Sequence, residues 1–227
     1  KDANHHSSIY NNAPMPNMQR LTWDGVALHA GNLPGFPASH GCVRMPLAFS
    51  KALFTTTPMG GTVIVAGDAA EPDATPLAGV LAPAMPGGTP VAHTPLAPDE
   101  QWRWQPERAP SGPVSIILSR ADQRAVVLRN GVEIGRSRIA IPTIDTTTDA
   151  LVLTAGADGR PHWLRTNVPG HGAGPAEADN PLGAMRAPAA FLAAMQPLLT
   201  PGVTVIVTNA PVKPATSGRV LQILASQ

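Results

Sequence analysis

The chain has 227 residues, a formal net charge of +1, 14% charged residues and 4% aromatic residues. A charge so close to zero, without a run of Lys or Arg, excludes a basic nucleic-acid-binding surface as the basis of function. No apolar run approaches the roughly 20 residues of a membrane span. The length suits one large domain or two small ones, and the 26 prolines and 21 glycines favour short strands over long helices.

The first 22 residues are polar and contain several turn signals. His5 and His6 are adjacent, and adjacent side chains of a strand point in opposite directions. No cysteine or carboxylate is spaced to complete a metal site with them. We therefore expect no metal, and no other cofactor, in this chain.

Residues 23–29 predict a turn at Asp-Gly followed by a short strand that ends near His29. Tyr10, Met18 and Trp23 are candidates for lining a peptide groove. For Tyr10 and Met18 the alternative is packing against a sheet.

The segment 39–45, Ser-His-Gly-Cys-Val-Arg-Met, holds the only cysteine of the chain. Cys42 lies two residues after His40 and two before Arg44, and His29 precedes it across a loop rich in Gly and Pro. A thiol becomes a nucleophile when a base lies within hydrogen-bond reach and nearby donors or positive charge favour its thiolate. The pattern predicts a cysteine acyl-transfer site; the alternative is a buried cysteine acting as a small apolar residue.

A helix and a strand are predicted after this segment. Pro46 suits the first turn of a helix. The residues that follow at helical spacing predict one apolar face packed on a core: Ala48, Phe49, Ala52 and Leu53. Two glycines then end the helix, and residues 62–66 predict a short buried strand.

Residues 69–112 differ in composition from the segments on either side. Proline mixed with Ala, Gly and Thr predicts an extended linker between a first region, 1–68, and a second, 113–227. Trp102 and Trp104 interrupt it. We interpret them as pinning the linker onto a domain surface, with a lip over a substrate groove as the alternative.

The second region is predicted to be rich in strands, with an Asn-Gly hairpin turn at 130–131. The expected strands are 114–119, 125–128, 132–134, 139–141, 151–154, 204–208 and 220–224, with one helix at 189–199.

An internal repeat relates the two regions. Residues 41–65 align with 183–207 at a constant shift of 142 without a gap, with 11 identities in 25 positions. Cys42 and His40 are replaced by Ala184 and Leu182, whereas Arg44 is retained as Arg186. The second region is thus predicted to be a degenerate copy without the chemistry.

The repeat also predicts that the first copy lacks its opening strands in this chain. The strands expected at 114–154 precede the second copy, and their counterparts would fall before residue 1. Either an N-terminal segment is absent from this chain, or strands of the second region complete the first sheet.

Residues 20–66, with His29 upstream of the Ser-His-Gly-Cys core, resemble the active-site signature of the L,D-transpeptidases, whose catalytic domain is called YkuD-like. The resemblance implies a mainly β fold with a few short helices (α+β), a YkuD-like sandwich or barrel. It also implies an exported enzyme of the periplasm or cell envelope that acts on peptidoglycan stem peptides, donor and acceptor, and is acylated by carbapenem-type β-lactams.

By the same resemblance, Cys42 is the nucleophile and His29 the general base, oriented by the carbonyl of Ala30. His40 supports the thiolate and the donor amide. The backbone N–H groups of Gly41 and Cys42 form the oxyanion hole, and Ser39 is counted among the positioning residues.

Arg44 has two possible roles. Its guanidinium can bind a stem-peptide carboxylate, but its retention as Arg186 in the degenerate copy favours a structural role. Two departures from the family concern the substrate: the loop from His29 to Ser39 is short, and Asn often stands where Arg44 does.

The predicted reaction is stem-peptide crosslinking through an acyl-enzyme, of the 3-3 type or the 1-3 type of one family branch. The alternatives are an L,D-carboxypeptidase or endopeptidase that uses water as acceptor, and a non-catalytic peptidoglycan-binding protein. A cysteine peptidase of another fold gains nothing from the Ser-His-Gly-Cys context.

Overall fold

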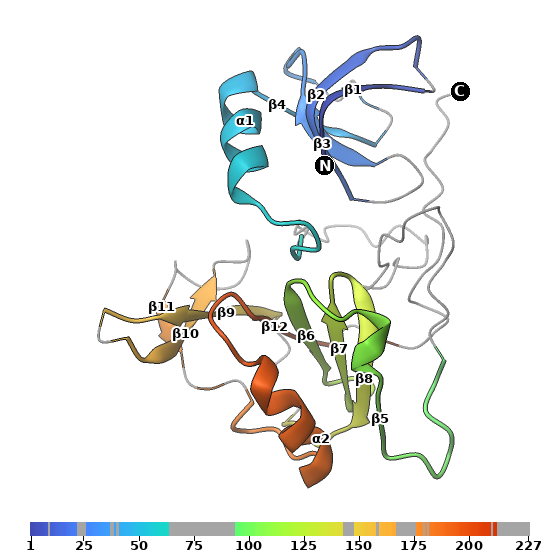
Figure 1. The fold of residues 1–227 in the computed structure, drawn as a ribbon, viewed down its shortest axis with the longest axis vertical. Coiled ribbons are helices and arrows are strands. Elements are labelled where there is room, and N and C mark those ends of the chain that lie inside the picture. The colour runs from blue at the N-terminus through green and yellow to red at the C-terminus, as the bar shows by residue number, and fades with distance from the viewer. Residues whose placement is uncertain are drawn as a thin grey trace. The chain divides into compact units, whose positions relative to one another are not determined.

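The structure is a computed structural model that describes residues 1–8, 10–21, 26–36, 39, 41–63, 94–142, 148–157, 159–166, 176–178, 180, 182–209 and 211–212. The chain divides into two compact units: residues 1–59 lie in the first, and residues 60–63 and 94–212 lie in the second. Each unit holds one sheet and one α-helix among its described residues (Figure 1). The prediction of a mainly β chain with a few short helices is confirmed.

The first unit is a four-stranded sheet in the order β1-β2-β3-β4. Its strands are β1 (Asp2–His6), β2 (Pro14–Arg20), β3 (Ala27–Ala30) and β4 (Val43–Met45). β1–β2 and β2–β3 are antiparallel pairs, whereas β3 and β4 run parallel. The parallel pair requires a connection back to the same end of the sheet, and residues 31–42 form that connection.

Strands β1 and β2 form a hairpin where the sequence indicated only turns. Asn11 and Asn12, both with positive φ, make the hairpin turn. Pro14 and Pro16 lie in the part of β2 that pairs only with β1, since β3 pairs with Gln19 and Arg20. Proline is tolerated there because one side of the strand has no partner to which it would donate.

Helix α1 (Leu47–Thr56) begins directly after Pro46 and contacts β2 and β3. The helix itself was predicted, but the face expected to be buried was not the one that packs. Ser50 is its only fully buried residue, whereas Phe49 is 57% exposed. The spacing of apolar residues identified a helix, but could not show that its apolar side would remain uncovered in this unit.

The strand predicted at 62–66 is described only at Thr62 and Val63, and neither residue is in a strand. The Thr62 hydroxyl instead hydrogen-bonds the side chain of Ser115. This start of the predicted strand lies in the second unit, and residues 64–66 lie outside the described residues.

The second unit is an eight-stranded sheet in the order β11-β10-β9-β12-β6-β7-β8-β5. The strands are β5 (Trp102–Trp104), β6 (Val114–Ser119), β7 (Arg124–Arg129), β8 (Val132–Arg138), β9 (Asp149–Ala155), β10 (Pro161–Thr166), β11 (Ala176–Ala178) and β12 (Thr204–Thr208). Only β6 and β12 pair in parallel. The remaining elements are helix α2 (Ala189–Met195) and the 3-10 helices η1 (Pro106–Arg108) and η2 (Gln196–Leu198).

The core of this unit centres on Phe191 of α2, which is fully buried. The rings of Trp102 and Trp104 meet it edge to face, with centroid distances of 6.3 and 5.7 Å. Both tryptophans belong to β5, which pairs with β8 at the edge of the sheet. The two tryptophans thus belong to the predicted linker 69–112, yet they pack over the core of the second unit. Its sheet includes Trp102, and so extends to residues before the predicted boundary at 113.

Most strands predicted in the second region are present. Residues 114–119 and 204–208 agree fully, and the strands predicted at 125–128, 132–134 and 151–154 are each extended by the structure. The prediction at 139–141 was wrong: Ala140 makes only an isolated bridge to Arg186. Strand β10 was missed, and residues 220–224 lie outside the described residues.

Candidate active site

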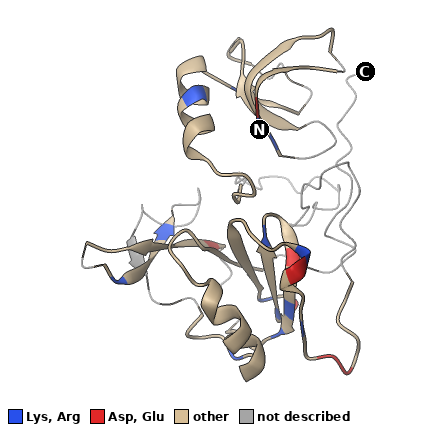
Figure 2. Ribbon diagram, in the orientation of Figure 1, with Lys and Arg blue, Asp and Glu red and all other residues tan. Residues whose placement is uncertain are grey.

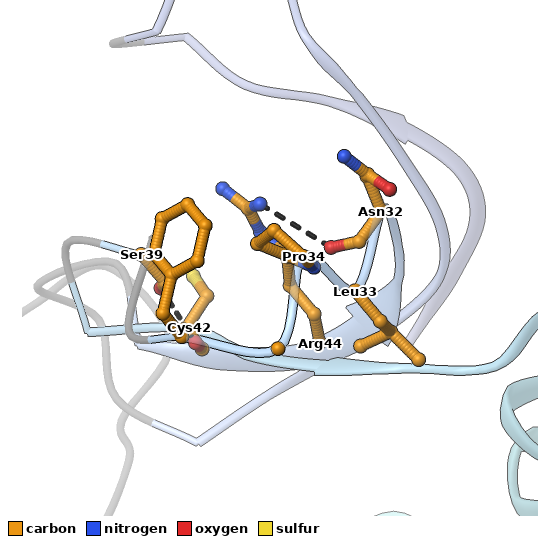
Figure 3. A pocket seen from close by; sticks show the side chains of 8 residues that line it. Asn32, Leu33, Pro34, Ser39, Cys42 and Arg44 are labelled. Carbon is orange, nitrogen blue, oxygen red and sulfur yellow. Dashed lines mark hydrogen bonds between the residues drawn. The ribbon is translucent and has the colours of Figure 1, made fainter.

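The candidate site lies on the first unit, where the connection between β3 and β4 folds over the start of β4. Eight residues line a cavity of about 400 Å³ there: Asn32, Leu33, Pro34, Gly35, Phe36, Ser39, Cys42 and Arg44 (Figure 3). The cavity therefore contains the thiol that the sequence singled out. It also combines apolar walls with one guanidinium.

His29 lies on β3 and is 7% exposed. Its Nδ1 is 2.7 Å from the carbonyl oxygen of Ala30. A carbonyl only accepts, so Nδ1 must carry the proton and the Nε2 lone pair remains available to act as a base. The short, buried hydrogen bond also fixes the plane of the ring.

The β3–β4 register places the histidine and the thiol on the same face of the sheet. His29 is the register partner of Arg44. Partners on neighbouring strands project to the same side, and residues two apart along an extended segment do so as well. Cys42 lies two residues before Arg44, and both line the cavity.

The turn that leads into Cys42 requires glycine. Gly41 has φ of 119°, a conformation that side-chain-bearing residues rarely adopt. The Ser39 hydroxyl donates to the carbonyl oxygen of Cys42 at 2.5 Å, closing the turn from the other side (Figure 3). Cys42 itself is half-buried, so its sulfur is neither sealed in the core nor fully in solvent.

Arg44 is half-buried and ties the wall of the cavity to β4. Its Nη1 donates to the carbonyl oxygen of Asn32 at 3.3 Å (Figure 3). The backbone N–H of Gly31 donates to the carbonyl oxygen of Met45 at 3.3 Å, extending the ladder by one bond. The start of the loop is therefore attached to β4 by one backbone hydrogen bond and by one hydrogen bond from the Arg44 side chain.

Charged groups are sparse on the first sheet and on α1, where Lys51 is the only ionisable residue of the helix (Figure 2). Among the described residues of this unit, the clear pKa shift belongs to Asp2. Hydrogen bonds from the Asn4 backbone and the His5 side chain hold the pKa of that carboxyl below its ordinary value. Asp2 lies on edge strand β1 and has no part in the cavity.

Two other predicted site residues, Tyr10 and Met18, are not among the residues that line the cavity. Tyr10 is exposed in the β1–β2 turn, and Met18 is buried at 3% exposure on β2, which is the packing role left open for it. His40 and Trp23 lie outside the described residues. Within the described ranges, no group of three His, Cys, Asp or Glu side chains is arranged to hold a metal ion.

The loop residues Asn32, Leu33, Pro34 and Phe36 were not predicted as cavity lining. Phe36 and Leu33 are 66% and 50% exposed, and both line the cavity. Their position in the sequence between His29 and Cys42 was the one feature that could have predicted this role. Their use as a wall depends on how the loop folds back, which composition does not determine.

Residues 1–65 match the family model of the YkuD L,D-transpeptidase catalytic domain. The resemblance of this segment to the L,D-transpeptidase family is thus confirmed. No curated protein and no solved structure matches the chain. Neither helix in the described part of the chain is long and apolar enough to cross a membrane.

Proposed function

We propose that the first unit, whose sequence is that of a YkuD-type catalytic segment, is a cysteine acyltransferase that crosslinks peptidoglycan stem peptides. Its donor and acceptor are two stem peptides, and its site of action is the periplasm or cell envelope. The proposal is supported by two observations: a buried histidine on β3 that is oriented by the Ala30 carbonyl, and a cysteine just before β4, the neighbouring strand, that lines the cavity.

The proposed reaction begins with attack of the Cys42 sulfur on a carbonyl carbon of the donor peptide. His29 Nε2 accepts the thiol proton, and the backbone N–H groups of Gly41 and Cys42 stabilise the oxyanion. Collapse of the tetrahedral species breaks the C–N bond, and the imidazolium returns its proton to the leaving amine. The donor acyl group is then a thioester on Cys42.

In the second half, an acceptor amine attacks the thioester. His29 takes the proton of that amine, and the thiol leaves and is reprotonated. Water in place of the amine gives hydrolysis, which is the carboxypeptidase or endopeptidase outcome. The exposed apolar residues Leu33 and Phe36 on the cavity wall support transfer, because a wall of this kind keeps water from the thioester while an acceptor stem is seated.

The second unit is proposed to be a scaffold derived from the same architecture. Ala184 takes the place of Cys42 and is exposed, so this copy offers no thiol at the equivalent position. Helix α2 starts at Ala189, the counterpart of Leu47 at the start of α1. Gly60 and Gly202, which follow the two helices at matched positions, both have positive φ.

The test is product analysis of purified muropeptides incubated with the full chain and with Cys42→Ala. Dimeric products that require Cys42 support transfer, and the cleaved bond gives the crosslink type. Shortened monomers alone would move the assignment to hydrolysis. In parallel, a carbapenem should add once to the intact wild type and not to Cys42→Ala; no adduct on folded wild-type protein would favour a non-catalytic wall-binding role.

A further inference from the structure

We infer that Arg44 and Gly31 together position the general base: the aliphatic stem of Arg44 packs across Gly31 toward the His29 ring and holds it for Cys42. Arg44 is then a positioning residue that acts through His29, not the group that binds a substrate carboxylate. The inference rests on the proposed function for its catalytic meaning, but its geometry is independent of the substrate.

Gly31 leaves a space that a side chain would fill. A Cβ at this position would lie 3.2 Å from Cδ of Arg44, 3.3 Å from its Cγ and 3.5 Å from Cε1 of His29. The arginine stem and the edge of the imidazole therefore meet around one point. A side chain at residue 31 would require the Arg44 stem to move by a few tenths of an ångström and would contact the edge of the His29 ring.

The two flanking side chains differ in their freedom to move. His29 is buried, and its Nδ1 bond to the Ala30 carbonyl fixes the plane of its ring. Arg44 is held at its far end by the Nη1 bond to the Asn32 carbonyl. The stem between these points then limits displacement of the imidazole.

The degenerate copy provides a comparison. Arg186 is retained at the shifted position of Arg44, but the residue at the shifted position of Gly31 is Ala173. Arg186 is exposed and forms backbone bonds to Ala140. The copy that lacks the thiol has therefore also lost the glycine, whereas it has kept the arginine. Retention of the arginine in a copy without a thiol is therefore no evidence for a role at the thiol, and the connection of Arg44 to His29 rests on the contacts around Gly31.

Two reagents distinguish the two possible roles of Arg44, which are positioning of His29 and binding of a substrate carboxylate. Iodoacetamide is neutral and reports the reactivity of Cys42 without needing a carboxylate contact. A carbapenem carries a carboxylate and reports both the maximal acylation rate and the concentration at half-maximal rate. Both reactions are followed by mass spectrometry on the full chain, with thermal unfolding to verify that each variant is folded.

Four variants are compared with wild type: Arg44→Met, which keeps an unbranched stem, Arg44→Ala, Gly31→Ala, and the double variant Gly31→Ala/Arg44→Ala. Arg186→Ala is the matched control and should react as wild type. Arg44→Ala and Gly31→Ala should each slow both reactions about 10- to 100-fold, the scale of a displaced catalytic group. Arg44→Met should lose less rate than Arg44→Ala, because it keeps an unbranched stem and loses only the Nη1 bond to Asn32.

The double variant tests the shared space directly. With the stem gone, the new methyl group has room, so the double variant should be no slower than Arg44→Ala alone. Rate losses that multiply in the double variant would overturn the inference. So would unchanged iodoacetamide rates combined with a raised half-saturating carbapenem concentration in both Arg44 variants, the signature of a carboxylate contact.

Failure of the proposed function is distinguishable from failure of this inference. If the carbapenem does not acylate wild type but the iodoacetamide rates follow the expected order, the base is positioned as inferred and the transfer chemistry is wrong. If acylation occurs and Arg44→Ala matches wild type with both reagents, the transfer chemistry holds and the inference fails.

Discussion

Helices α1 and α2 start at matched positions of the internal repeat, each directly after a proline, yet their matched phenylalanines have opposite environments. Phe191 is fully buried beneath two tryptophans, whereas Phe49 is 57% exposed. The residues within each helix are similar, so the difference comes from what surrounds it. The second unit has a Trp-bearing edge strand over its helix, and the first sheet has no such strand among its four.

The same contrast extends to the whole surface. Every large hydrophobic side chain that is exposed in the described residues lies between Tyr10 and Val63. The copy that carries the thiol is therefore the one with uncovered apolar surface, and the copy without it has a closed core. The two copies thus keep the same local structure, whereas the first carries the thiol and the second carries the well-packed core.

The largest effect should come from moving the thiol between the copies. Cys42→Ala should lose all carbapenem adduct, and Cys42→Ala/Ala184→Cys should not regain it: His171 stands at the shifted position of His29, but Leu182 stands where His40 does and Ala173 where Gly31 does. Intact-mass spectrometry measures the adduct. Labelling of the moved cysteine at the wild-type rate would show that the second copy retains a working site.

Removing the base should give the next largest effect. His29→Ala should slow acylation of Cys42 about 10²- to 10⁴-fold, the usual contribution of a general base. The rate of β-lactam addition under single-turnover conditions is the measurement. His6→Ala, an exposed histidine on edge strand β1, is the matched control and should leave that rate unchanged; equal losses in both variants would point to a general loss of structure.

The two phenylalanines should differ in stability. Phe191→Ala should lower the free energy of unfolding of the second unit by about 3–5 kcal/mol, because it leaves a cavity beneath Trp102 and Trp104. Phe49→Ala should change the unfolding free energy by about 0.5 kcal/mol or less, as for other exposed positions. Denaturant unfolding followed by tryptophan fluorescence tests both variants. Similar losses of unfolding free energy in the two variants would contradict the difference in burial between Phe191 and Phe49.

The smallest effect concerns the approach to the covering strand. Glu100 accepts hydrogen bonds from the Arg103 guanidinium and from the Ala97 N–H, and these hold the pKa of its carboxyl below the ordinary 4.5. A lowered folded pKa stabilises the protein above pH 4.5, and this is lost as the pH falls through the folded value. Glu100→Gln should therefore lower the melting temperature slightly at pH 7, and by progressively less as the pH falls below 4.5. A gap that persists unchanged at pH 3 would contradict this.

Sequence alone predicted the strongly patterned elements. The apolar strands at 114–119 and 204–208 and the starts of both helices follow from β-branched runs and from Pro46 and Pro188, which act over a few residues. The same reasoning missed β1 and β2, where polar residues and two prolines form strands because a neighbouring strand supplies their hydrogen bonds. Pairing partners are tertiary information, and composition does not contain them.

For the site, sequence by itself determined which residues are candidates for chemistry. A single cysteine in a Ser-His-Gly-Cys setting with an upstream histidine predicts the nucleophile and the base of an acyl transfer, and the family match covers that segment. Tertiary structure decided how they are arranged: the parallel β3–β4 register puts His29 opposite Arg44 and on the face of Cys42, and the folded loop encloses the cavity. Strand register depends on hydrogen bonds between distant segments, so no local pattern could have specified it.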